Sequence, residues 1–267
     1  MRSTALEEKL KHIGDVFRIQ GTLYSILVMT DGNINSTYKL GYRREDGTVK
    51  AYVAQKINPY VFKHPAEIMN NIDLVTSHIR NNLAEGQISL HFHHTADGKN
   101  YYVDEEDGSF WRLYTFINAL SFNTSDSLTV LKNAGEAFGQ FQMQLSDFDA
   151  AQLFETIPDF HNTKKRLDTF FSHVEEDPLG RAASIQEEID YLRSVRELAS
   201  RLSEMLERGE LPLRVTHNDT KINNVLFDKK TQRSLVVIDL DTVMPGLAMH
   251  DFGDAVRFAG QPLTRQV

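Results

Sequence analysis

The segment 215–227 joins a polar loop to an apolar strand pattern on either side. It places His217, Asp219 and Asn224 at the spacing His-x-Asp-x-x-x-x-Asn. This spacing is typical of a phosphoryl-transfer loop, where a carboxylate accepts the proton of an attacking hydroxyl and an amide oxygen binds Mg²⁺ on nucleotide phosphates. We therefore predict that Asp219 is the catalytic base and Asn224 a metal ligand. His217 is predicted to support the loop by hydrogen bonding to backbone and carboxylate groups.

A second acidic element follows at the end of the apolar run 235–238. A buried strand there would deliver Asp239 to the same edge as the loop, so we predict that Asp239 is the principal Mg²⁺ ligand. Asp241 lies two residues further along. Its role stays open, because it could hold a substrate hydroxyl, bind a second metal or meet a lysine or arginine.

The triplet Asp-Phe-Gly at 251–253 has the letters of the metal-binding triplet of protein kinases. It lies about a dozen residues past Asp239 and opens a predicted helix that runs through Arg257. A residue at that place is better interpreted as a helix N-cap than as a metal ligand. We therefore assign the metal to Asp239 and the cap to Asp251.

Upstream of this region, short strands alternate with two helices. The first helix is amphipathic, opens near Thr4, and has Leu6, Leu10 and Ile13 on one face. Strands are expected at 22–29, 36–40, 49–57, 101–103 and 110–116, and a second helix from 65 to about 82.

Downstream, helices are expected at 128–145, 165–171 and 185–206. The order indicates an α+β, bilobal, protein-kinase-like fold. We expect a small nucleotide-binding lobe with an antiparallel sheet at 1–117 and a larger, mostly helical catalytic lobe at 118–267.

The turn between the first two strands is expected to cover the nucleotide phosphates with backbone N–H groups and short polar side chains. Its candidate contacts are Gly32, Asn33 and Asn35. The connector between the lobes is expected to lie beside adenine, with Phe116 and Asn118 as candidates.

The run Val-Ala-Gln-Lys at 53–56 resembles a strand element whose lysine binds the α- and β-phosphates. Gln55 and Lys56 point to opposite faces of that strand, so only one of them can face the nucleotide. We favour Lys56 slightly. Its acidic partner would be Glu67 or Asp73, from the helix that follows.

Composition narrows the class of protein. The 267 residues are 41% hydrophobic and 25% charged, which is ordinary for a globular protein, and the formal net charge of −8 disfavours binding to nucleic acid. Cysteine is absent, which excludes disulfides and thiolate chemistry, and no stretch is long and apolar enough to predict a membrane span. With a nucleoside triphosphate as co-substrate, the expected location is the cytoplasm.

These motifs resemble the aminoglycoside phosphotransferase and choline kinase superfamily and, more narrowly, the N-acetylhexosamine 1-kinases. The similarity is most specific at 213–224, 238–246 and 251–254, and it extends more weakly to three further segments, 31–38, 55–58 and 138–142. The resemblance implies phosphorylation of the anomeric hydroxyl of N-acetylglucosamine or N-acetylgalactosamine by ATP. It also implies Mg²⁺ on Asn224 and Asp239, with Asp219 as base and the sugar beside it.

Two alternatives stay open. The acceptor could be choline, homoserine or an aminoglycoside, or the chain could be a catalytically silent nucleotide-binding module. Kinases of this kind continue with further helices after the element at 251–254, whereas this sequence stops at Val267. We therefore expect C-terminal helices to be missing and an apolar face to be exposed where they would pack.

Overall fold

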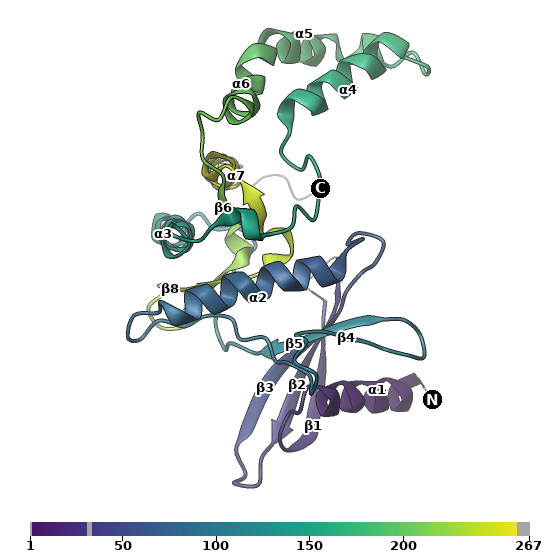
Figure 1. Ribbon diagram of the computed structural model, residues 1–267, viewed down its shortest axis with the longest axis vertical. Helices are drawn as coiled ribbons and strands as arrows, with labels where there is room; N and C mark the ends of the chain where they lie inside the picture. The colour runs from purple at the N-terminus through teal and green to yellow at the C-terminus, as the bar shows by residue number, and fades with distance from the viewer. Residues whose placement is uncertain (1, 31–33, 261–267) are drawn as a thin grey trace.

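The computed structural model describes residues 2–30 and 34–260 and has two lobes, with α2 lying between the sheet and the large lobe (Figure 1). The predicted α+β, bilobal fold is confirmed. The small lobe consists of α1 (Arg2–Val16), β1 (Thr22–Met29), β2 (Ser36–Arg43), β3 (Val49–Lys56), α2 (Pro65–Asn81), β4 (Tyr102–Val103) and β5 (Phe110–Thr115). Its strands form one antiparallel sheet in the order β1-β2-β3-β5-β4.

The alternation of side chains along the strands gives this sheet two different faces. One face packs against α1 in a hydrophobic cluster that includes Leu10, Ile13 and Tyr42. The opposite face carries Gln55 of β3 and Arg112 of β5, which are direct partners in the register of the two strands. The second face meets the large lobe, so the polar groups on it are placed at the junction of the lobes.

The large lobe combines helices with two small sheets. Its helices are α3 (Leu128–Gln144), α4 (Thr163–Glu176), α5 (Gln186–Ser194), α6 (Arg196–Glu207) and α7 (Ala248–Ala259). Its strands are β6 (Arg214–Thr216) paired with β9 (Met244–Gly246), and β7 (Val225–Phe227) paired with β8 (Ser234–Val237). Four short 3₁₀ turns connect them: η1 (Ala150–Gln152), η2 (Ala182–Ile185), η3 (Ile222–Asn224) and η4 (Leu240–Thr242).

The single helix expected over 185–206 is wrong, because the chain bends at Val195 and forms α5 and α6. The bend lets both helices contact α4 (Figure 1), where Ile189 of α5 joins the buried Leu167 and Phe171 of α4, and Ala199 of α6 packs beside them. Because α5 and α6 each have an apolar stripe, the apolar periodicity of the sequence continues across the bend at Val195.

A buried asparagine of α2 joins the two lobes. Asn71 donates hydrogen bonds to the carbonyl oxygens of Phe154 (2.8 Å) and Val243 (3.0 Å), and accepts one from the Phe154 N–H (2.9 Å). Buried amides without partners destabilise a fold, and three of the four hydrogen-bonding positions of Asn71 are filled here. The helix is thereby fixed to the segment that follows Asp239.

An apolar groove of about 440 Å³ lies between α3 and α7. It leaves Phe252 72% exposed and Val256 55% exposed. An exposed apolar surface thus lies on α7, the helix that contains the Asp-Phe-Gly-Asp element. Among the residues that the structure describes, every helix is too short or too polar to cross a bilayer.

The contact between α1 and the sheet depends on a glycine. A Cβ at Gly14 would overlap Tyr42 Oη and lie 2.7 Å from Tyr42 Cζ, and the Tyr42 ring is buried against Tyr52. We expect Gly14→Ala to lower the free energy of unfolding by about 1–3 kcal/mol, because the ring has no room to move.

The measurement is urea unfolding, with Gly135→Ala in α3 as the matched control, since no atom lies within 4 Å of a Cβ built there. The control should change stability little or raise it by up to about 1 kcal/mol. Equal stability of the two variants would contradict the close approach.

Candidate active site

The loop between β6 and η3 has an unusual backbone that is held by hydrogen bonds on all sides. Asn218 has φ 66°, in the left-handed region, and its side-chain amide donates to the carbonyl oxygen of Thr242 (2.8 Å). The His217 ring is buried, accepts at Nδ1 from the Asp219 N–H (3.3 Å) and donates from Nε2 to the Ile238 carbonyl (2.9 Å). These contacts connect the loop to the end of β8.

Two carboxylates of α7 complete the support of this loop. Asp251 accepts hydrogen bonds from the N–H groups of His217 and Asn218, both at 2.8 Å, and Asp254 accepts one from the Thr220 N–H (2.9 Å). The predicted N-cap role of Asp251 is wrong, because α7 begins three residues earlier and Leu247 occupies the cap position. Asp251 is only 4% exposed and holds loop backbone instead.

The loop brings three of its polar side chains together. The Asp219 carboxylate accepts a hydrogen bond from Asn224 Nδ2 (3.0 Å) and pairs with Lys221 Nζ (2.8 Å) through the same oxygen, Oδ2. Asn224 Nδ2 also donates to the Asp219 carbonyl (2.8 Å). The amide of Asn224 is therefore oriented, with its nitrogen on Asp219 and its oxygen turned away from it.

Asp239 follows β8 and has φ 60°, a left-handed conformation that turns the chain into η4. Its carboxylate makes no hydrogen bond with any residue that the structure describes. Crowding by protein atoms and, secondly, the charge of Asp241 raise the pKa of Asp239 to about 6, although the residue itself is open to solvent. The charge of Asp219 also raises the pKa of Asp239, so these two carboxylates interact electrostatically.

Such a site suits a hard divalent cation. Mg²⁺ prefers oxygen ligands and usually takes one or two protein groups, completing its shell with water and substrate phosphates. Asp239 offers an unpartnered carboxylate, and Asn224 offers an amide oxygen. Within residues 2–30 and 34–260, no cluster of three or more His, Cys, Asp or Glu side chains could hold a metal by itself.

The parity of β3 decides between Gln55 and Lys56 as the residue that faces the large lobe. Gln55 Oε1 accepts a hydrogen bond from Arg112 Nε (2.9 Å) on the face that meets the large lobe. Lys56 lies on the other face, where its Nζ pairs with Asp107 (3.3 Å). The preference for Lys56, with Glu67 or Asp73 as its acidic partner, is therefore corrected: Lys56 points to the side of the sheet that α1 covers, and its acidic partner is Asp107.

The other nucleotide-site candidates that the structure describes are Asn35, Phe116 and Asn118. Asn35 Nδ2 donates to Asp241 (2.9 Å), and Gly32 and Asn33 lie outside the described residues. Phe116 follows β5 and has Lys39 Nζ 3.8 Å from its ring centroid. Asn118 accepts a hydrogen bond from Lys229 Nζ (2.7 Å) at the surface of the connector.

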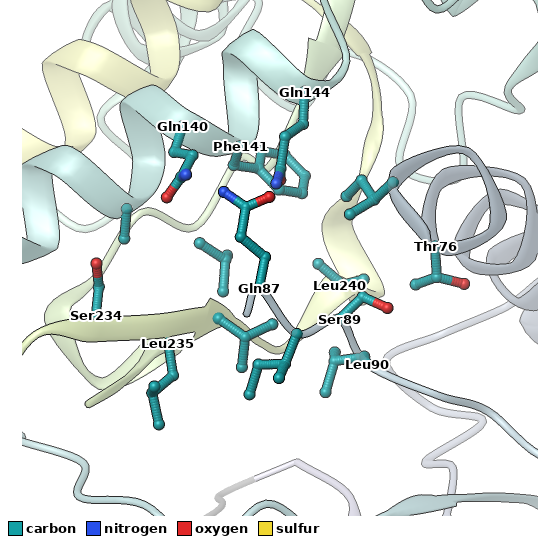
Figure 2. A pocket seen from close by; sticks show the side chains of 15 residues that line it. Thr76, Gln87, Ser89, Leu90, Gln140, Phe141, Gln144, Ser234, Leu235 and Leu240 are labelled. Carbon is teal, nitrogen blue, oxygen red and sulfur yellow. The ribbon is translucent and has the colours of Figure 1, made fainter. Parts of the chain in front are cut away.

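A small hollow between α3, β8 and the segment 87–90 includes none of the candidate site residues. Figure 2 shows the side chains of Gln87, Gln140 and Gln144 pointing toward one another there, beside α3 and β8. Its volume is about 50 Å³, whereas ligand pockets usually measure about 300–1,000 Å³. A nucleotide would therefore not fit in it.

Two residues of the site were missed by the sequence reasoning. Lys221 lies two positions after Asp219, and this closeness to the predicted base was the signal in the sequence that could have identified it. Arg112 is a charged residue within the otherwise apolar or aromatic strand Phe110–Leu113, and a buried arginine requires a carboxylate partner. Asp241 is that partner, so of the roles left open for it, pairing with an arginine is the one observed.

The sequence profile of the phosphotransferase enzyme family matches residues 26–267, a span that begins within β1 and includes every candidate site residue named above. The chain belongs to the phosphotransferase enzyme family. The broader of the two resemblances drawn from the sequence is thus confirmed.

Several solved structures share the fold of this phosphotransferase. Spectinomycin phosphotransferase, in complex with ADP and spectinomycin, is 15% identical with a TM-score of 0.54, covering 96% of this chain and 80% of the other. Amicoumacin kinase, in complex with AMP-PNP, Ca²⁺ and Ami, is 14% identical with a TM-score of 0.58, covering 97% of this chain and 71% of the other. A microcompartment-associated aminopropanol kinase is 15% identical with a TM-score of 0.56, covering 94% and 74%.

The support of the loop by α7 can be tested directly. In Asp251→Asn, one oxygen becomes an NH₂ group that faces a backbone N–H, so we expect the free energy of unfolding to fall by about 1.5–3 kcal/mol. Hydrogen exchange of the His217 and Asn218 amides should accelerate more than that of the core strands. The control is Glu187→Gln on the exposed side of α5, and the same exchange pattern in both variants would contradict the anchoring role.

Proposed function

We propose that this phosphotransferase transfers the γ-phosphoryl group of ATP to a hydroxyl of a small molecule, with the anomeric hydroxyl of an N-acetylhexosamine as the acceptor. The observation that carries the proposal is the grouping of Asp219, Lys221 and Asn224 in one loop, in the electrostatic environment of the unpartnered Asp239. The kinases of spectinomycin, amicoumacin and aminopropanol share this fold and act on small molecules, which supports a small acceptor.

Asp219 is the base in this proposal. Its carboxylate accepts the proton of the acceptor hydroxyl while the hydroxyl oxygen bonds to the γ-phosphorus and the bond from that phosphorus to the β–γ bridging oxygen breaks. The hydrogen bond from Asn224 fixes the direction of the carboxylate, and positioning of this kind accounts for much of the rate of phosphoryl transfer. Lys221 Nζ, beside Asp219, is placed to neutralise charge on the transferring group.

Asp239 and the amide oxygen of Asn224 are the groups that would hold Mg²⁺. The ion, when bound, neutralises charge on the β- and γ-phosphates. In the proposal, Gly32, Asn33 and Asn35 cover the phosphates, while Phe116 and Asn118 lie beside adenine.

The sugar acceptor rests on the resemblance at 213–224, 238–246 and 251–254. It is the finer part of the proposal, and choline, homoserine and aminoglycosides are its rivals. The division into lobes at 117/118 and a cytoplasmic location, where ATP is available, belong to the same proposal.

The first test measures ADP release with Mg²⁺ and ATP across N-acetylglucosamine, N-acetylgalactosamine, choline, homoserine and an aminoglycoside. Sugar-dependent release is expected, with the product phosphorylated at C1 by ³¹P NMR. Asp219→Asn should reduce turnover by about 10²–10⁴-fold and leave nucleotide affinity nearly unchanged, because the amide cannot accept the proton. Full turnover in this variant would remove Asp219 from the mechanism, and ATP binding without transfer to any acceptor would favour a non-catalytic module.

Lys221 is tested separately. Lys221→Met removes the ammonium group and is expected to lower kcat by roughly 10²-fold, with a smaller effect on the KM for the acceptor. Lys230→Met, at an exposed position three residues after β7, is the matched control. Equal kcat values in these two variants would show that Lys221 has no part in the transfer.

A further inference from the structure

A buried ion pair between the lobes joins the small-lobe sheet to the segment that follows Asp239. Arg112 of β5 and Asp241 of η4 are each 3% exposed. Arg112 Nη1 donates to Asp241 Oδ1 and Nη2 donates to Oδ2 (3.1 Å), so the pairing is bidentate. Arg112 Nε donates to Gln55 Oε1 (2.9 Å), and Nη1 lies 3.8 Å from Met69 Sδ. The guanidinium is thus held by protein groups along both of its edges.

The same carboxylate receives a second small-lobe contact. Asn35 Nδ2 donates to Asp241 Oδ2 (2.9 Å), while Asn35 Oδ1 accepts from the Asn58 N–H (3.0 Å). Gln55 Nε2 donates to Thr37 Oγ1 (3.0 Å), which continues the network into β2. Arg112 of β5 and Asn35, just before β2, therefore donate to one carboxylate of the large lobe. Gln55 of β3 and Thr37 of β2 are linked to that carboxylate through Arg112.

Fold stability alone does not explain such a pair. Removing two charges from water is unfavourable, and apolar residues of similar volume often stabilise a buried site equally well. Its geometry gives a more specific role. Asp241 lies in the 3₁₀ turn that Asp239 opens in a left-handed conformation, so a fixed Asp241 fixes the backbone on which the Asp239 carboxylate is mounted.

We propose that Arg112 is a positioning residue that acts through Asp241, holding Asp239 and the small-lobe sheet in the relative arrangement that phosphoryl transfer requires. This inference rests on the proposed function. The role differs from the one predicted for Lys56, which was to bind the α- and β-phosphates. Arg112 does not contact the nucleotide in this proposal, because its donors are occupied by Asp241, Gln55 and Met69.

The test uses the full chain and four variants: Arg112→Met, Arg112→Lys, Arg112→Met with Asp241→Asn, and Lys56→Met. Arg193→Met, on the exposed side of α5, is the control for the Arg-to-Met change. The double variant removes both charges and so avoids an uncompensated carboxylate, which keeps the test valid if Arg112→Met alone fails to fold. Melting temperature, kcat, KM for the acceptor and the affinity for ATP with and without Mg²⁺ are measured for each.

We expect the double variant to melt near the wild-type temperature but to lose about 10²-fold in kcat, the size of effect that a displacement of about 1 Å produces. The KM for the acceptor should change little, and Arg112→Lys should recover part of kcat. A double variant with wild-type stability and wild-type kcat would overturn the proposal. So would a large loss of kcat in Lys56→Met with none in Arg112→Met.

Binding separates the failure of this proposal from that of the proposed function. Mg²⁺ should strengthen ATP binding by the wild-type protein and by Arg193→Met, and this enhancement should be lost in the double variant while ATP affinity in EDTA is kept. If the wild type transfers phosphate to no acceptor, the proposed function fails, and the Mg²⁺ enhancement still decides whether Arg112 positions Asp239. An enhancement of wild-type size in the double variant would overturn the positioning role.

Discussion

The backbone of the loop 217–220 depends on the carboxylates of α7. A loop that turns through a left-handed residue at Asn218 cannot pair its N–H groups with a neighbouring strand, and buried N–H groups require partners. Asp251 supplies acceptors for two of them and Asp254 for a third. Because α7 also contacts α3 and β6, the direction of the Asp219 side chain follows from helix packing more than thirty residues further along the chain. The helix is part of the site without contributing a reacting group.

Three further carboxylates lie near this loop, and their partners distinguish them. Asp219 has Lys221, and Asp241 has Arg112, whereas Asp239 has no partner among the described residues. Like charges that cannot all be neutralised by the protein raise the pKa of the least compensated group. That group is also the one where a cation gains most by binding. The electrostatics therefore favour Asp239 as the metal ligand independently of its place in the sequence pattern.

The sequence predicted those elements whose pattern is decided locally. The expected strand at 22–29 coincides with β1, and α2 begins at Pro65 as expected. What failed depends on contacts between distant segments. Continuous periodicity over 185–206 hid the bend at Val195, because both halves pack on the same helix. The N-cap assigned to Asp251 failed for a similar reason: nothing local shows that a carboxylate in the first turn is taken by a distant loop.

Gln55 and Lys56 show that a short sequence motif does not by itself identify which of two neighbouring strand residues faces the other lobe. Strand alternation requires that the two residues face opposite ways, but it does not say which face meets the other lobe. Here α1 covers one face, and the acidic hairpin between β4 and β5 on that side pairs Asp107 with Lys56 and Asp104 with Lys9. The opposite face is left to Gln55 and Arg112. A lysine in a familiar run of letters therefore indicates a phosphate contact only when the register of its strand relative to the packed faces is known.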